Sequence, residues 1–177
     1  EFHRVVQALQ TFCSEDLGGF YLDILKDRLY TTAPKSVARR SAQSALWHIT
    51  QAFVRLLAPI TAFTAEEVWQ VLTGKAEDSV MFQQWHDLPA QPGEGDLLAK
   101  WALIRTVRAD VTKALEAQRE AGKIGSALQA AVEIRCGGEK YAALDSLGDD
   151  LKFVLICSST ALLRDETEQV IATPLDY

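Results

Sequence analysis

The stretch SVARRSAQSALWHITQAFVRLLAP, from Ser36 to Pro59, decides how this chain is expected to fold. Its apolar side chains recur every three or four residues, which is the spacing of an amphipathic α-helix. Ser36 is a suitable N-cap for that helix, and Pro59 disrupts its hydrogen bonding at the other end. The positions expected to face inward are Val37, Leu46, Ile49, Phe53, Leu56 and Leu57. A helix of this length predicts partner helices that cover its apolar stripe.

Two helical patterns precede this stretch. Apolar residues recur at helical spacing over residues 2–12 and again over 17–25. Ser14 is expected to be an N-cap between them, because acidic residues follow it in the first turn. Residues 31–35 then form a connector to the long helix.

Further helices are predicted after Pro59. Thr64 and Glu67 have the spacing of a capping box, and Gly74 is expected to stop the helix that they begin. An irregular stretch follows, over residues 75–95. Its apolar patch is expected to hold it to the helices; the patch consists of Val80, Met81, Phe82 and Trp85.

The last predicted helix of this part is long. Asp96 is expected to cap it, the helix runs to about Glu120, and Gly122 closes it. Four or so packed helices of such lengths predict a helical bundle over residues 1–122.

The pattern changes after Gly122. Val132, Ile134 and Cys136 alternate with polar residues, which is typical of a strand with one buried face. A short helix, an apolar run read as helix and two short strands are expected to follow, at 141–147, 151–157, 161–163 and 169–172. The fold class is therefore mainly α: a helical bundle followed by a small α+β appendage over residues 123–177.

Composition bounds the function. The chain of 177 residues is 48% hydrophobic and 24% charged, which is ordinary for a soluble globular protein. No apolar run approaches the ~20 residues that a membrane span needs, and no signal peptide is recognisable, so we expect a cytoplasmic protein without a membrane partner. The three cysteines are widely scattered, which predicts reduced thiols and neither a disulfide nor a metal site.

The net charge of −6 disfavours a nucleic-acid partner, but the charge is unevenly distributed. Residues 26–40 hold five basic side chains against one acid, and residues 100–123 hold six against three. Two local basic surfaces of this kind are what RNA binding requires. Charge alone fits ordinary solvated helix faces better.

No catalytic pattern is present in the sequence. It contains no nucleophile elbow, no phosphate-binding glycine loop and no metal-binding histidine helix. His48 falls within the long predicted helix, where a packed or capping histidine is expected. Glu66 and Glu67 are neighbours on a helix and point about 100° apart, so they cannot act as a facing acid and base.

The segment GFYLDILKDRLY, residues 19–30, contains the candidate RNA contact. On a helix, Lys26 shares a face with Asp23 and Tyr30. A cation beside an aromatic ring at a helix end suits an unstacked base. An ordinary amphipathic helix with charged surface positions explains the same spacing, and from these residues alone it is the stronger reading.

Four strings, in this order, resemble the carboxy-terminal third of bacterial isoleucyl-tRNA synthetases. They are FCSEDLGGFYLDILKDRLYT (12–31), SVARRSAQSALWHI (36–49), VRLLAPITAFTAEEVW (54–69) and GKIGSALQAAVEI (122–134). The third and fourth strings also resemble the valyl and leucyl enzymes, whereas FYLDILKDRLY is closer to the isoleucine enzyme. The resemblance covers nearly the whole chain.

The resemblance implies a module that recognises the anticodon stem and loop of isoleucine tRNA. It places Lys26 near the anticodon bases, with Arg28 and Tyr30 as helpers. It places Arg39 and Arg40 against backbone phosphates, where contacts position an RNA rather than specify its sequence. No catalytic or metal-binding residue is implied for this chain.

The chain departs from whole synthetases of this family. The ATP signatures His-Ile-Gly-His and Lys-Met-Ser-Lys-Ser are absent, and so are the editing domain and the terminal zinc module with its Cys-x-x-Cys pairs. We therefore expect a chain cut at both ends, not an enzyme itself, whose parent is an isoleucine–tRNA ligase. ATP, magnesium and zinc then belong to the parent, and its other domains are partners of this one. A valyl-tRNA synthetase module and a helical protein-interaction domain are the alternatives.

Overall fold

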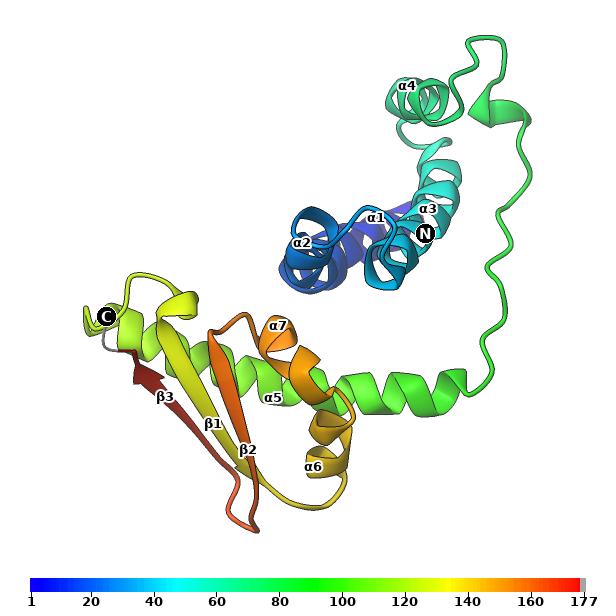
Figure 1. Ribbon diagram of the computed structural model, residues 1–177. Coiled ribbons are helices and arrows are strands. Elements are labelled where there is room, and N and C mark those ends of the chain that lie inside the picture. The colour runs from blue at the N-terminus through cyan, green and yellow to red at the C-terminus, as the bar shows by residue number, and fades with distance from the viewer. Residues whose placement is uncertain (176–177) are drawn as a thin grey trace. The chain divides into compact units, whose positions relative to one another are not determined.

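The computed structural model describes residues 1–175, which form two compact units. The first unit combines Glu1–Ile24 with the chain from Pro92 onward, and the second is Leu25–Gln91. Each unit has its own buried apolar cluster. The elements are labelled in Figure 1.

The first thirty residues are helical almost throughout. α1 (Phe2–Thr11) passes into a π-helical stretch, Phe12–Leu22, and then into α2 (Asp23–Tyr30). The prediction that Ser14 caps a new helix is wrong. The helix does not break there, and the Ser14 hydroxyl donates to the carbonyl of Gln10 at 3.0 Å.

The first unit is built on the long helix α5 (Glu94–Glu120). This helix follows Gly93, so Asp96 lies in its first turn and is not the predicted cap. It ends before Gly122, as predicted, where φ is +68°. It buries one apolar residue every three or four positions, namely Ile104, Val107, Val111 and Leu115. Amphipathic spacing thus becomes one continuous packing face.

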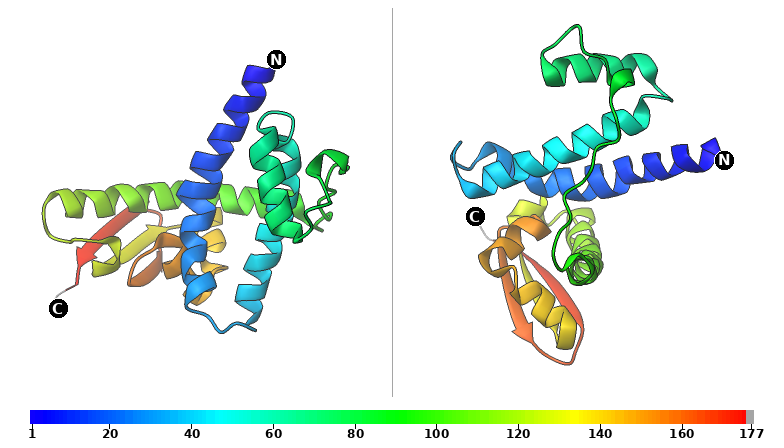
Figure 2. Two further views of the ribbon diagram at one scale, coloured as in Figure 1. Left: turned by 90° about the horizontal axis from the view of Figure 1, so that it is seen from above. Right: turned by 90° about the vertical axis from the view of Figure 1, so that its right-hand side faces the viewer.

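That face packs against a three-stranded sheet. The strands β1 (Ala130–Cys136), β2 (Ser159–Arg164) and β3 (Gln169–Pro174) lie in the order β2-β1-β3. β1 pairs with β2 in parallel and with β3 in antiparallel orientation. The right-hand view of Figure 2 looks nearly along α5 and shows the helix beside the sheet.

The predicted alternation of β1 is confirmed: Val132, Ile134 and Cys136 are buried. Two short helices connect β1 to β2, α6 (Gly138–Asp145) and α7 (Leu151–Leu155). The helical reading of the ambiguous run at 151–157 is therefore correct over Leu151–Leu155, and both later strands lie where they were predicted.

The second unit contains α3 (Val37–Leu57), α4 (Ala62–Thr73) and a 3₁₀ turn, Val80–Phe82. Ser36 caps α3 as predicted, since its hydroxyl accepts the N–H of Arg39. The core of this unit consists of Val54, Ala58, Ala65, Trp69 and Val80. α3 and α4 meet where this cluster lies.

Two of the inward positions predicted for α3 are exposed. Val37 is the first residue of the helix and is 85% exposed, and Leu56 is 41% exposed. Val54 is the buried residue of that turn, and Leu56 lies two positions, or about 200°, further around the helix. The remaining positions, Leu46, Ile49, Phe53 and Leu57, are half-buried.

The capping box predicted at Thr64 and Glu67 is also wrong. α4 begins three residues earlier, at Ala62 after Thr61, so Thr64 lies inside the helix. Gly74 ends α4 as predicted, with a left-handed φ of +68°. The carboxylate of Glu66, also within α4, accepts hydrogen bonds from the hydroxyl of Ser79 (2.8 Å) and the N–H of Val80 (3.1 Å). These bonds connect α4 to the start of the 3₁₀ turn.

The patch expected to hold residues 75–95 is smaller than predicted. Val80 is buried in the core of the second unit, whereas Met81, Phe82 and Trp85 are 51%, 82% and 69% exposed. The 3₁₀ turn presents a single side chain inward, which explains why Val80 is buried and Met81 and Phe82 are not.

The fold class agrees with the prediction: the chain is mainly helical, with a small α+β part. α5 packs with the sheet in the first compact unit, although it was assigned to the helical domain at residues 1–122. The predicted domain boundary between residues 122 and 123 stays a prediction. The two compact units are defined by how the chain packs, which need not coincide with domain boundaries along the sequence.

Candidate nucleic-acid interface

The loop between α2 and α3 connects the two helix segments that carry the predicted RNA-binding residues. The Thr32 hydroxyl donates to the carbonyl of Arg28, the residue two before the end of α2. The Ser36 hydroxyl donates to the Thr32 hydroxyl (3.2 Å) and accepts the N–H of Arg39 (3.2 Å). A chain of hydrogen bonds therefore connects the last turn of α2 with the first turn of α3.

Three of the predicted residues lie on α2. Lys26 is exposed, Tyr30 is 81% exposed and Arg28 is half-buried. Lys26 and Tyr30 are four residues apart in one helix, so they share a face as predicted. Asp23, three residues before Lys26 in the same helix, pairs with α5: its carboxylate lies 3.4 Å from the guanidinium of Arg108.

The other two predicted residues lie in the first turn of α3. Arg39 is half-buried, and its guanidinium donates to the carbonyl of Thr32 at 3.4 Å. Arg40 is exposed. The first-turn N–H groups of a helix carry a partial positive charge, which adds to that of the two arginines. The structure thus places all five predicted residues at two helix ends joined by a six-residue loop.

A cluster of rings lies further along α3. Nδ1 of His48 is 3.0 Å from Nε2 of His86. Trp47 meets the two imidazoles edge-on, with ring centres 4.8 and 5.4 Å away. Both histidines are half-buried, so the expectation that His48 is a packed histidine is confirmed. Trp47 itself stays 49% exposed.

The cluster borders a hollow of about 300 Å³ on the surface of α3. Its lining consists of Arg40, Gln43, Ser44, Trp47 and His48. These residues follow the i, i+3, i+4, i+7 and i+8 spacing of one helix face. The hollow therefore extends from a predicted phosphate contact to an exposed indole ring.

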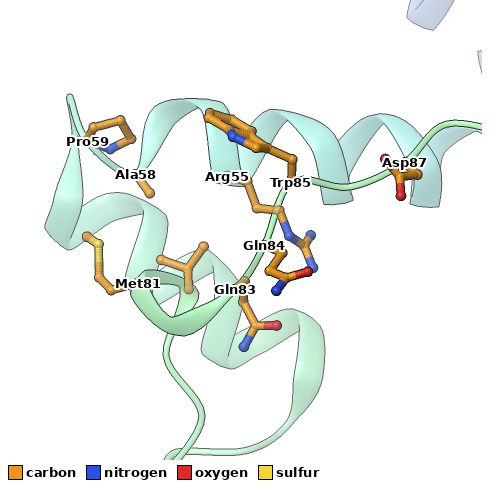
Figure 3. Close-up of a pocket in the computed structure, with 9 residues that line it drawn as sticks. Arg55, Ala58, Pro59, Met81, Gln83, Gln84, Trp85 and Asp87 are labelled. Atoms are coloured by element: carbon orange, nitrogen blue, oxygen red, sulfur yellow. The ribbon is translucent and has the colours of Figure 1, made fainter.

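A second hollow, of about 560 Å³, lies between the end of α3 and the segment after the 3₁₀ turn. Figure 3 shows the ring of Trp85 alongside α3 and the guanidinium of Arg55 extending toward Gln84. The Arg55 guanidinium lies 4.6 Å from the ring centre of Trp69, and it donates to the side-chain oxygen of Gln51 at 2.6 Å. Burial lowers the pKa of Arg55, although a guanidinium stays charged throughout the physiological range.

Two of the six basic residues in the second basic stretch, Arg105 and Arg108, pack inside the first unit. Arg105 pairs with Asp16 at 2.6 Å and lies over the ring of Phe20. Arg108 pairs with Asp23 and donates to the carbonyl of Gly19. Burial lowers the pKa of Arg108, and Asp23 partly opposes this effect. The ordinary structural explanation therefore fits these two arginines.

The described residues offer no assembled metal site: within 1–175, no three His, Cys, Asp or Glu side chains are grouped to hold a metal ion. Over the same residues, no helix is long and apolar enough to cross a membrane. The interface between α2 and α3 combines guanidinium, ammonium and aromatic groups. Groups of these kinds contact phosphates and unpaired bases in protein–RNA complexes.

The sequence model of the anticodon-binding domain of tRNA ligases matches residues 1–134. The chain belongs to this family. It is 91% identical, over its full length, to the isoleucine–tRNA ligase of Dechloromonas aromatica, of which it covers 19%. It is 59% identical to the isoleucine–tRNA ligase of an Azoarcus species, over 98% of this chain and 19% of that protein. The chain spans about a fifth of the length of these relatives.

Within this anticodon-binding domain, sequence reasoning did not single out Trp47 or His86. A signal for Trp47 was present, because it lies seven residues after Arg40 on the same helix face. His86 had none: it is 38 residues from His48, in a segment without periodicity. A contact between residues so far apart in the sequence depends on the tertiary fold, which local sequence patterns do not encode.

Proposed function

We propose that this domain binds the anticodon stem and loop of isoleucine tRNA, as the RNA-recognising part of an isoleucine–tRNA ligase, and carries out no chemistry itself. One observation carries the proposal. In a chain of the anticodon-binding family, cationic and aromatic side chains gather at the junction of α2 and α3. The names of the similar proteins favour isoleucine over valine as the cognate amino acid.

The end of α2 reads the bases. Lys26 directs an ammonium donor to the edge of an anticodon base, and Tyr30 offers an exposed ring on the same face for stacking. Arg28 assists from the same turn, where its carbonyl accepts the Thr32 hydroxyl and so fixes the loop. Unpaired loop bases are the part of an RNA that proteins read in this way.

The start of α3 holds the RNA backbone. Arg40 is exposed for a phosphate contact, and Arg39 combines a phosphate contact with its bond to the loop carbonyl of Thr32. These contacts fix the register of the RNA and contribute salt-dependent affinity, because each one releases counterions from the backbone.

The remaining functions belong to the parent enzyme. There, a separate catalytic domain attaches isoleucine to the tRNA with ATP and magnesium, and a zinc module follows the anticodon-binding region. We place this parent in the cytoplasm, where its tRNA is found, with the other synthetase domains as partners of this one.

Titration of the 177-residue chain with two tRNA transcripts tests the proposal. One is isoleucine tRNA and the other is the same RNA with a changed anticodon, each measured over a series of salt concentrations. We expect tighter binding of the first RNA throughout. Equal binding of both RNAs at every salt concentration contradicts the proposal.

The phosphate contacts have their own readout. Arg40→Ala is expected to weaken both RNAs about equally and to lower the slope of log affinity against log salt by about one unit. Arg39→Ala should have the same effect on the slope. Arg4→Ala is the matched control, because this exposed arginine of α1 pairs with Glu1 at 3.3 Å and lies outside both basic stretches.

A further inference from the structure

One exposed tryptophan on α3 is held in a fixed orientation. The ring of Trp47 meets the ring of His48 at 84° and that of His86 at 83°. The hydrogen bond between the two imidazoles keeps these supports together, and each of them is half-buried. An aromatic ring held in this way loses little conformational freedom when another flat molecule stacks on it.

The surroundings of this ring are cationic and polar. The hollow beside Trp47 is lined by Arg40, Gln43, Ser44 and His48 besides Trp47 itself, and no acidic residue lines it. Arg40 and Trp47 are seven residues apart on one helix face, a rise of about 10 Å. A single nucleotide, measured from its phosphate to the far edge of its base, suits this spacing.

We propose that Trp47 is a stacking platform for an unpaired tRNA base whose phosphate pairs with Arg40. The Gln43 amide lies between these two groups and offers both a donor and an acceptor to the edge of the base. This inference rests on the proposed function. It adds a second base contact to that of Lys26, located on α3 about two helical turns beyond Arg40. The positive, acid-free lining favours RNA over an apolar peptide.

The test compares three variants of the 177-residue chain in binding to the isoleucine tRNA transcript. Trp47→Ala removes the platform and should weaken binding roughly five- to 150-fold, the usual range for losing one base stacked on an aromatic ring. Trp47→Phe keeps a smaller ring and should lose much less. Phe63→Ala is the matched control, because it removes another exposed aromatic ring that does not line the hollow. Phe63 lies on α4 and is 93% exposed.

Tryptophan emission provides the readout that a merely structural role would not change. A base stacked on Trp47 quenches its fluorescence, so part of the quenching seen with wild-type protein should vanish in Trp47→Phe while the RNA still binds. Circular dichroism of each variant verifies that the helices are retained.

Two results overturn the inference while the proposed function stands. In the first, Trp47→Ala binds tRNA as tightly as the wild type, with the anticodon preference intact. In the second, Trp47→Phe keeps the full quenching. If the wild-type chain binds both tRNA transcripts equally, the proposed function fails, and the platform fails with it.

Discussion

At the scale of single residues, Lys26 is the side chain on which anticodon reading is expected to depend. It is exposed and shares a helix face with Tyr30. We predict that Lys26→Ala narrows the difference in binding free energy between cognate and changed-anticodon tRNA by about 1–3 kcal/mol, because a base contact is lost. Fluorescence anisotropy with both RNAs measures this difference.

Lys35 supplies the control for Lys26, since it is an exposed lysine of the nearby loop with no assigned base contact. Lys35→Ala should leave the preference between the two RNAs unchanged. If Lys26→Ala instead weakens both RNAs by the same factor, Lys26 contacts a phosphate and reads no base.

The three cysteines differ in reactivity for a reason visible in the fold. Cys13 is exposed, whereas Cys136 and Cys157 are buried. Burial raises the pKa of the Cys157 thiol to about 11, and it also raises that of Cys136. Because the thiolate is the reactive form, we predict that one thiol per folded chain reacts with a disulfide reagent at pH 8, and three after denaturation. Cys13→Ser should abolish the fast reaction, and fast modification in that variant would contradict the assignment.

The same shift makes stability depend on pH. The unfolded Cys157 thiol ionises near its ordinary pKa of 9.0, whereas the folded one does so at about 11. Its contribution to the free energy of unfolding is therefore fully present below pH 9 and is lost as the pH rises toward 11.

At the scale of elements, the centre of the sheet is expected to determine the stability of the first unit. Ile134 lies in the middle strand, is 1% exposed and packs in the cluster that α5 covers. We predict that Ile134→Ala lowers the free energy of unfolding by about 2–5 kcal/mol, because the cavity cannot fully collapse. Urea denaturation followed by circular dichroism measures this loss.

An isoleucine on the neighbouring strand is the comparison. Ile171 of β3 pairs in register with Glu133 of β1 and is 36% exposed. Ile171→Ala should cost less than half as much as Ile134→Ala. Equal losses would mean that burial in the sheet does not set the stability of this unit.

The elements also show what a sequence can predict and what it cannot. The alternation at Val132, Ile134 and Cys136 identified β1, because period-two spacing is a property of the strand itself. The stops at Gly74 and Gly122 were predictable, since both need a left-handed φ. The starts at Ser14, Thr64 and Asp96 were not, because a residue able to cap a helix also fits inside one. The candidate site shows the same difference between local and long-range features. Helical spacing was enough to suggest Lys26 and Tyr30, whereas the contact between His48 and His86 can be seen only in the folded structure.

At the scale of the whole molecule, two separate cores imply two separate units of stability. One core is made of residues from Glu1–Ile24 and Pro92 onward, and the other lies within Leu25–Gln91. The two clusters share no residue. The unit that contains the proposed RNA contacts is thus inserted in the sequence between two parts of the other unit.

A matched pair of valines tests this division. Val54 is 5% exposed in the core of the second unit, and Val111 is fully buried in that of the first. Each change to Ala should cost about 2 kcal/mol, mainly through lost apolar burial. Hydrogen–deuterium exchange should accelerate in Val54→Ala only within residues 25–91, and in Val111→Ala only outside them, because sub-global opening follows cooperative units. If either change accelerates exchange across both units equally, the chain unfolds as one cooperative body, and the second unit could not rearrange around an RNA on its own.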